Sequence, residues 1–236
     1  MQKLLSYVRR AVDDYHMISD GDCIAVGVSG GKDSLVLLLA LAQLRRFYPH
    51  PFSLKAITLD MGFDGMDFSP IAEFCRQLDV EFILESTEIK QIVFDARKEK
   101  HPCSLCAMLR RGALQNTALA HGCNKVALGH HQDDVIETYM LSLLYEGRMS
   151  CFWPVTELDG KDLSILRPLI YTPESYIRSI TKKQSLPIVH STCPQDGSSK
   201  RQEIKDLLWS VEKQNRGARQ RIFGAIQRYP LEGWEK

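Results

Sequence analysis

The sequence predicts an α/β fold with a doubly wound, mainly parallel sheet and a helical C-terminal extension. Three observations support this prediction. Short apolar runs alternate with longer amphipathic runs over the first two-thirds of the chain, which is typical of parallel strands joined by helices. Polar stretches that contain glycine follow several of the apolar runs. After residue 147 the alternation gives way to mainly helical patterns.

Four strands, each followed by a helix, are expected in order along the first part of the chain. Each expected strand is a short apolar run, and each expected helix carries apolar residues at three- or four-residue intervals. Glycine is expected to end the last two helices. The expected strands are residues 22–29, 52–60, 80–86 and 124–130, and the expected helices are residues 34–48, 67–79, 104–122 and 133–147.

The remaining part of the chain is predicted to be mainly helical. Residues 164–170 are expected to form an edge strand, and residues 173–184 a helix with proline in its first turn. Residues 200–214 read as a further amphipathic helix. We therefore divide the chain into an α/β domain over residues 1–170 and a helical extension over residues 171–236 that is not an independent domain.

The composition is that of an ordinary soluble globular protein. Of the 236 residues, 44% are hydrophobic and 25% are charged. No apolar run reaches the length that a membrane-spanning helix needs, so no membrane partner is expected. The N-terminal stretch is amphipathic and lacks the apolar core and cleavage site of a signal peptide. A cytoplasmic location is the simplest prediction.

The small net charge of +1 hides an uneven distribution. Residues 57–95 hold nine acidic and two basic residues, whereas residues 97–111 hold five basic residues and one acidic residue. Residues 200–236 hold nine basic and five acidic residues. Such asymmetry is compatible with a basic face for a polyanion, and equally with ordinary solvated helix surfaces.

Residues 29–34, SGGKDS, form a glycine-rich turn between an expected strand and an expected helix. The turn is not a Walker loop, because Asp33 stands where that motif needs Ser or Thr and Val26 stands where it needs glycine. The dinucleotide fingerprint also fails, because Lys32 takes the place of its third glycine. Backbone N–H groups and the helix dipole at such a turn nevertheless attract phosphate. The turn is therefore predicted to bind a phosphate group.

Two other polar stretches follow expected strands. They are LDMGFDG at residues 59–65 and LGHHQDD at residues 128–134. In a doubly wound sheet, ligands bind beyond the carboxyl ends of the strands. The three stretches are therefore expected to share one edge of the sheet and one ligand site.

Three of the seven cysteines stand in polar surroundings. Cys103 and Cys106 are three residues apart at the start of an expected helix, so both thiols face one side, and the helix dipole is expected to lower their pKa. Cys193 lies in a polar loop. Three thiolates fit an iron–sulfur cluster with one open iron, or a zinc site completed by His190 or another histidine. The other cysteines are expected to pack as small apolar residues: Cys23, Cys75, Cys123 and Cys151.

The stretch SGGKDS resembles the PP-loop of the ATP pyrophosphatase superfamily, whose members cleave ATP between the α- and β-phosphates. Together with CSLCAMLRRGAL, LGHHQDD and the late Cys193, it is similar to the TtcA family of tRNA 2-thiocytidine synthetases over about residues 15–215. Relatives that form thiouridine usually carry zinc-binding cysteine pairs near the N-terminus. Residues 1–22 contain no cysteine, which favours the TtcA branch.

The resemblance implies an ATP site with Mg²⁺. The loop residues would bind the pyrophosphate, with Lys32 and Asp33 acting in catalysis and Asp33 lying near Mg²⁺. Further residues after the other strands would flank the nucleotide. The implied ATP-binding residues are Val28, Ser29, Gly30, Gly31, Lys32, Asp33, Ser34, Asp60, Gly129, His130 and Asp134.

The resemblance also implies a [4Fe–4S] cluster on Cys103, Cys106 and Cys193, which would be catalytic. ATP would adenylylate O2 of a cytidine in the anticodon loop of tRNA, and sulfur would replace that oxygen. The sulfur donor would be a cysteine desulfurase or inorganic sulfide, and a homodimer is compatible with the resemblance. Arginines at two places are implied to contact tRNA: Arg110, Arg111, Arg216 and Arg219.

Two other functions stay open from the residues alone. One is an adenylylsulfate-type reductase, which would share the same core but would release sulfite and would not hydrolyse ATP. The other is a nucleotide-binding module in which a structural zinc takes the place of the cluster. The leading prediction remains an ATP-dependent tRNA sulfurtransferase that releases AMP.

Overall fold

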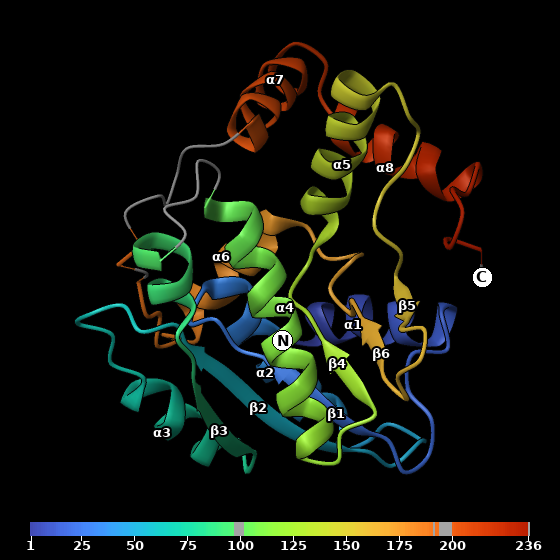
Figure 1. The fold of residues 1–236 in the computed structure, drawn as a ribbon. Coiled ribbons are helices and arrows are strands. Elements are labelled where there is room, and N and C mark those ends of the chain that lie inside the picture. Colours follow the sequence, from blue (N-terminus) through green and yellow to red (C-terminus); the bar gives the residue numbers. More distant parts are fainter. Residues whose placement is uncertain (97–101, 191, 194–199, 236) are drawn as a thin grey trace.

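The protein is described by a computed structural model that covers residues 1–96, 102–190, 192–193 and 200–235. Its centre is a six-stranded sheet with the strand order β3-β2-β1-β4-β6-β5 (Figure 1). Five of the described strands run parallel to one another, and the sixth, β5, is antiparallel to its neighbour β6. The strands are β1 (Cys23–Gly27), β2 (Ser53–Asp60), β3 (Glu81–Ser86), β4 (Lys125–Ala127), β5 (Val155–Glu157) and β6 (Ser164–Leu166). The predicted doubly wound, mainly parallel sheet is confirmed.

The expectation of an edge strand at residues 164–170 is wrong. β6 lies inside the sheet, parallel to β4 on one side and antiparallel to β5 on the other. Its residues Ile165 and Leu166 are buried. The edge position belongs to β5, which has only three residues and is too short to show a strand-like periodicity in the sequence.

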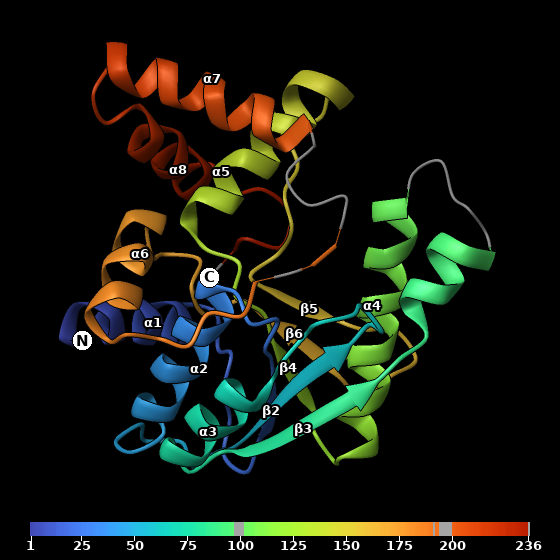
Figure 2. The same ribbon diagram turned by 90° about the vertical axis from the view of Figure 1, so that its left-hand side faces the viewer.

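Helices cover both faces of the sheet. Figure 2 shows one group on one side of the sheet and α4 (Pro102–Ala120) on the other. Because the two faces are covered separately, the apolar interior forms two clusters. The first group consists of α1 (Gln2–Asp14), α2 (Lys32–Leu44), α3 (Ser69–Gln77) and α6 (Glu174–Lys183).

Helix α2 is the central helix of the larger apolar cluster. Every residue from Ser34 to Ala42 is buried, because the sheet lies on one side of the helix and α1 and α6 lie on others. A helix that is apolar all round is expected where neighbours enclose it completely. This burial fixes the N-terminus of α2, and therefore the end of the SGGKDS turn, in a rigid frame.

A third group of helices lies beyond the carboxyl edge of the sheet (Figure 1). It consists of α5 (Gln132–Leu141), α7 (Lys200–Gln214) and α8 (Ala218–Arg228), which contact one another. The expected helix at residues 133–147 is α5 continued by a wider π-helical turn, η2 (Ser142–Glu146). Gly147 ends it with a φ of 65°, the left-handed conformation that glycine adopts readily.

Three helices of the described residues were not expected from the sequence: α1, α8, and the short π-helical segment η1 (Gln91–Ala96). Within the part of the chain that the structure describes, every helix is too short or too polar to cross a bilayer. Three of the basic residues expected near the start of α4 lie outside the described residues: Arg97, Lys98 and Lys100.

Candidate active site

The SGGKDS loop and the loop after β4 meet at the point where the strand order reverses. β1 pairs with β2 on one side and with β4 on the other, so the chain leaves these two strands in opposite directions. This is the place where doubly wound sheets bind ligands. Gly129 brings the two loops into contact, since a Cβ there would lie 3.0 Å from the carbonyl carbon of Asp33 and 3.1 Å from the nitrogen of Ser34. Only glycine fits so close to another backbone.

The phosphate loop is held by hydrogen bonds of its own and by a segment from the C-terminal extension. The Ser34 hydroxyl donates to the Gly31 carbonyl over 3.0 Å and accepts from the Ser29 N–H over 3.2 Å. Gly30 has a φ of 84°, and its carbonyl accepts a 3.0 Å hydrogen bond from the Val189 N–H. The loop is therefore shaped by the protein itself and is covered on one side by residues near Val189.

Lys32 is shared between two carboxylates. Its Nζ lies 2.9 Å from Asp33 Oδ2 and 3.1 Å from Glu174 Oε1 at the start of α6. Burial alone would lower the pKa of Lys32, but the hydrogen bonds to Asp33 and Glu174 raise it above its ordinary value. Burial would likewise raise the pKa of Glu174, but hydrogen bonds from Arg178 and Lys32 lower it to about 2. Lys32 and Glu174 are therefore both charged at neutral pH.

The second oxygen of Asp33 differs from the first. Asp33 Oδ1 is buried and accepts no hydrogen bond from any residue that the structure describes. The ring nitrogen Nε2 of His131 lies 3.6 Å from this oxygen. A buried carboxylate oxygen without a donor is costly, so this atom is suited to a cation or to a donor brought by a ligand.

The two aspartates of the loop after β4 are engaged in structural contacts. Asp134 and His131 form a capping box at the start of α5, with hydrogen bonds of 3.0 and 3.3 Å, and Asp134 Oδ1 also lies 3.1 Å from Arg201. Asp133 Oδ2 accepts a 2.7 Å hydrogen bond from the Glu174 N–H, and its Oδ1 lies 2.5 Å from Arg219. Asp134 thus caps α5 through Oδ2 and pairs with Arg201 through Oδ1.

His130, on the loop after β4, packs against Phe152, which lies shortly before β5. Its ring centre is 4.9 Å from that of Phe152, and the guanidinium of Arg167 lies 5.1 Å from the same Phe152 ring. Burial, assisted by the charge of Arg167, lowers the pKa of His130 to about 4, so the imidazole is neutral at neutral pH. Its buried Nδ1 has no hydrogen-bond partner within the described ranges.

The three cysteines approach one another at this edge of the sheet. Cys103 and Cys106 lie in the first two turns of α4, and the thiol of Cys106 interacts electrostatically with those of Cys193 and Cys103. Burial raises the pKa of Cys106, and nearby Arg110 only partly offsets that rise. The expected lowering of the Cys106 pKa by the helix dipole is therefore wrong, because desolvation outweighs it.

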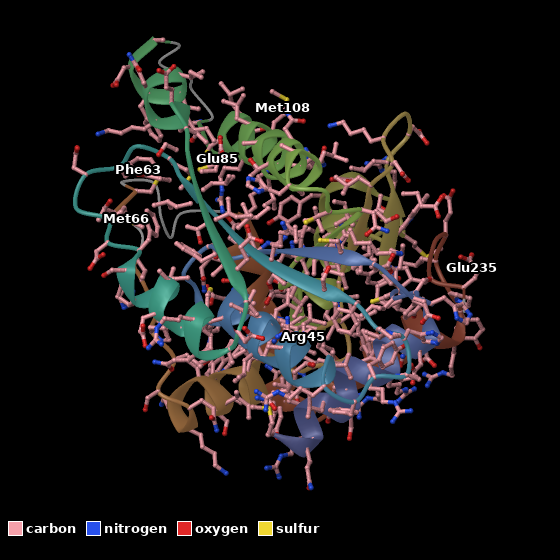
Figure 3. The ribbon with its side chains drawn as sticks, turned by 90° about the horizontal axis from the view of Figure 1, so that it is seen from below. Arg45, Phe63, Met66, Glu85, Met108 and Glu235 are labelled. Atoms are coloured by element: carbon pink, nitrogen blue, oxygen red, sulfur yellow. The ribbon has the colours of Figure 1, made fainter. Side chains whose placement is uncertain are left out.

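The thiols are not gathered into a finished metal site. Among the residues that the structure describes, no group of three or more His, Cys, Asp and Glu side chains is arranged to hold a metal ion. The segment with Cys193 is tied to the loop after β2, where the Thr192 hydroxyl donates to the Asp64 carbonyl over 3.2 Å. On α4, Met108 is 54% exposed and points away from the molecule (Figure 3), so this end of the helix faces solvent.

The remaining predicted site residues are an aspartate that stabilises a turn and four arginines that differ in exposure. Asp60 Oδ1 accepts a 2.9 Å hydrogen bond from the Gly62 N–H and so stabilises the turn after β2. Arg110, Arg111 and Arg216 are exposed. Arg219 differs from these three predicted tRNA contacts, because its side chain is only 25% exposed and is paired with Asp133.

Sequence reasoning missed the charged residues that approach the loop from the C-terminal part. Glu174 reaches Lys32, and Arg201 reaches Asp134. An acidic residue after Pro173 has an ordinary explanation in the helix dipole. Nothing in the sequence pairs it with a lysine on another helix, so no local signal could have identified it.

The fold and the loop together define a PP-loop protein, and residues 4–212 match the family described as PP-loop domain. The chain is 38% identical over 228 residues to the tRNA-cytidine(32) 2-sulfurtransferase of Geobacter sulfurreducens, covering 95% of this chain and 89% of that protein. It is 39% identical over 216 residues to the protein of the same name from Pelobacter propionicus, covering 90% and 80%. The chain belongs to the tRNA-cytidine(32) 2-sulfurtransferase family. The predicted family and the prediction of a sulfurtransferase enzyme are confirmed.

A solved structure has the same fold. The U34-tRNA thiolase NcsA from Methanococcus maripaludis, determined with its [4Fe-4S] cluster, superimposes with a TM-score of 0.77 and 24% sequence identity. The superposition covers 97% of this chain and 79% of that one. The predicted α/β architecture with C-terminal helices is therefore found in a tRNA thiolase.

Proposed function

We propose that the enzyme uses ATP to replace O2 of a cytidine in the anticodon loop of tRNA with sulfur, giving 2-thiocytidine. One observation carries this proposal. The Val189 N–H donates a hydrogen bond to the Gly30 carbonyl of the phosphate loop, and Cys193, four residues later, lies within electrostatic range of Cys106. A phosphate-binding loop and a set of thiols thus meet at one edge of the sheet. Cytidine is chosen as the target because the relatives are tRNA-cytidine(32) 2-sulfurtransferases.

The reaction balances in two steps. The cytidine O2 attacks the α-phosphorus of ATP, so an O–P bond forms and pyrophosphate leaves. Sulfur then attacks C2, the C2–O bond breaks, and the oxygen departs as part of AMP. Activation by adenylylation is needed because the unmodified oxygen is a poor leaving group. This order assigns the SGGKDS loop to the first step and the cysteines to the second.

The chain's own groups are suited to the first step. The N–H groups of the loop and the N-terminus of α2 would bind the pyrophosphate, and Lys32 would add its positive charge. Asp33 Oδ1, the buried oxygen without a hydrogen-bond donor, is a suitable ligand for Mg²⁺. The neutral His130 and the glycine at 129 would flank the nucleotide. Asp60 and Asp134 are proposed as nearby polar contacts.

The cysteines fit an iron–sulfur cluster by their chemistry. Thiolates are the usual ligands of such clusters, and Cys103, Cys106 and Cys193 supply three of them on two converging segments. A [4Fe–4S] cluster held by these three residues would leave one iron open to carry the incoming sulfur. The solved thiolase NcsA, which contains a [4Fe-4S] cluster, supports this assignment. A structural zinc would need a fourth ligand.

The tRNA would approach across the exposed start of α4. Arg110 and Arg111 lie on the same helix as two of the cysteines and are open to solvent, so they are proposed to contact the target loop, whose cytidine must be splayed out. Arg216 is a proposed phosphate contact. Arg219 would have to leave Asp133 to play the same part.

Several finer points belong to the same proposal. The sulfur would come from inorganic sulfide, or from a cysteine desulfurase together with a reductant that brings the persulfide sulfur to the sulfide level. We propose that the enzyme acts on tRNA in the cytoplasm, and a homodimer is compatible with the proposed reaction.

The direct test is mass spectrometry of tRNA nucleosides from cells that lack this gene. We expect 2-thiocytidine to disappear and to return when the wild-type gene is restored. Unchanged thionucleosides would contradict the proposal. Purified protein separates the alternatives: release of sulfite from adenylylsulfate would indicate a reductase, and anaerobic protein with zinc but no visible iron–sulfur absorbance would indicate a zinc module.

A further inference from the structure

We propose that Glu174 is a positioning residue for Lys32: it holds the lysine at the phosphate loop before ATP binds and competes with the phosphates for its charge. This inference rests on the proposed use of ATP. Glu174 is neither in the SGGKDS loop nor in the loop after β4. It reaches the site from α6, in the C-terminal part of the chain.

The contact between the two residues is close and partly enclosed. Glu174 Oε1 lies 3.1 Å from Lys32 Nζ, and the side chains are 16% and 27% exposed. A pair of this kind is screened less than a surface ion pair. Arg178, one helical turn further on, donates to the same oxygen over 2.9 Å. Glu174 therefore remains ionised and keeps an attractive charge beside the lysine.

Glu174 is fixed in place without help from Lys32. Its backbone N–H donates to Asp133 Oδ2 over 2.7 Å, and Asp133 is in turn paired with Arg219 on α8. The chain two residues earlier is tied down as well, since the Thr172 carbonyl accepts from the Gln132 N–H over 3.1 Å. The backbone of Glu174 is thus part of a framework that joins α5, α6 and α8.

The charges around Lys32 explain why the contact matters for function. Two carboxylates, Asp33 and Glu174, already balance the lysine. The pyrophosphate part of ATP brings several more negative charges and must take over at least one of these contacts. Glu174 therefore weakens the binding of ATP. In return it orders a side chain that would otherwise have many rotamers, which places the charge correctly when the pyrophosphate leaves.

The test compares Glu174→Gln with the wild type in ATP binding and in tRNA thiolation. Removing the competing charge should lower the Kd for ATP by about threefold to tenfold, since each 1.4 kcal/mol is worth a factor of ten. Losing the positioned lysine should lower kcat by about tenfold. Tighter binding together with slower turnover is a result that simple damage to the structure would not give.

A matched control and a conservative variant complete the design. Glu73→Gln makes the same chemical change at an exposed glutamate on α3, whose pKa is also lowered to about 2 by its arginine partner, and should leave both constants unchanged. Glu174→Asp keeps the charge but withdraws it from Lys32, so kcat should fall at least threefold while the Kd for ATP stays within twofold of the wild-type value. This variant decides the question if the Gln variant does not fold.

Two outcomes would overturn the inference. One is weaker ATP binding by Glu174→Gln with kcat unchanged, which would make Glu174 a simple structural contact. The other is no change in either constant. Failure of the wild-type protein to bind ATP is a separate result, because it would contradict the proposed function itself.

Discussion

The phosphate loop and the cysteine region lie at the same edge of the sheet but are held in place very differently. Around residues 29–34 the backbone is fixed by the buried helix α2, by the close approach of Gly129 and by the hydrogen bond from Val189. Cys103 is exposed, and Cys106 and Cys193 are half-buried on a helix end and an extended segment. The protein itself shapes the site for phosphate, whereas the thiols are partly open to solvent.

This difference agrees with the chemistry proposed for each region. A loop that stabilises charge during adenylylation has to be organised in advance, because preorganised dipoles contribute most to such steps. Thiols that bind a cluster and accept sulfur need access to solvent and to the tRNA. The following predictions test whether the two regions are separable in this way.

The largest effect is expected at the cysteines. Cys193→Ser should abolish thiolation of tRNA while leaving the affinity for ATP unchanged, because the phosphate loop does not depend on the thiol. The measurement is 2-thiocytidine formation together with ATP binding by calorimetry. Cys23→Ser, at the opposite end of β1, is the control and should retain thiolation. Loss of ATP binding by Cys193→Ser would show that the two regions are not separable.

The next largest effect is expected at Lys32. Lys32→Ala should weaken ATP binding by about a hundredfold, since a partly buried charge-assisted contact contributes on the order of 2 to 3 kcal/mol. Thiolation should fall at least as far, but the visible absorbance of the anaerobic protein should not change. Loss of that absorbance in the variant would show that the cysteine region depends on the phosphate loop.

Substitutions at two glycines, one beside the phosphate loop and one on the cysteine helix, are expected to change stability in opposite directions. Gly129→Ala should destabilise the protein by about 1 to 3 kcal/mol, because its Cβ would lie 3.0 Å from backbone atoms of Asp33. Gly112→Ala on the cysteine helix α4 meets nothing within 4 Å and should stabilise by about 0.5 to 1 kcal/mol. Urea unfolding of both variants measures the difference, and equal effects would contradict it.

The smallest effect is expected for the pH dependence of stability, through a buried glutamate on α5. Glu137 on α5 is 1% exposed, and burial raises its pKa to about 7. Its folded-state pKa lies above the unfolded value, so stability is lost as pH rises from about 4.5 to about 7. Glu137→Gln should remove this loss and stabilise the protein by about 1 kcal/mol at pH 8, with little effect at pH 4.5. Thermal unfolding at the two pH values checks the sign.

Much of the site could be predicted from the sequence because its signals are local. The SGGKDS turn, the spacing of Cys103 and Cys106, and the alternation of strands and helices are each contained in short stretches of chain. The family followed from their combination. The roles of the individual residues remain predictions, because the structure describes where they lie and not what they bind.

The tertiary structure alone decided the contacts between distant parts of the chain. It placed β6 inside the sheet, paired Arg219 with Asp133, and buried His130 against Phe152. It also brought Glu174 to Lys32. The sequence by itself determined the kind of loop and the set of thiols, since local geometry depends on neighbouring residues. Packing decided which charges surround the phosphate loop, because these charges come from helices that are far apart in the chain.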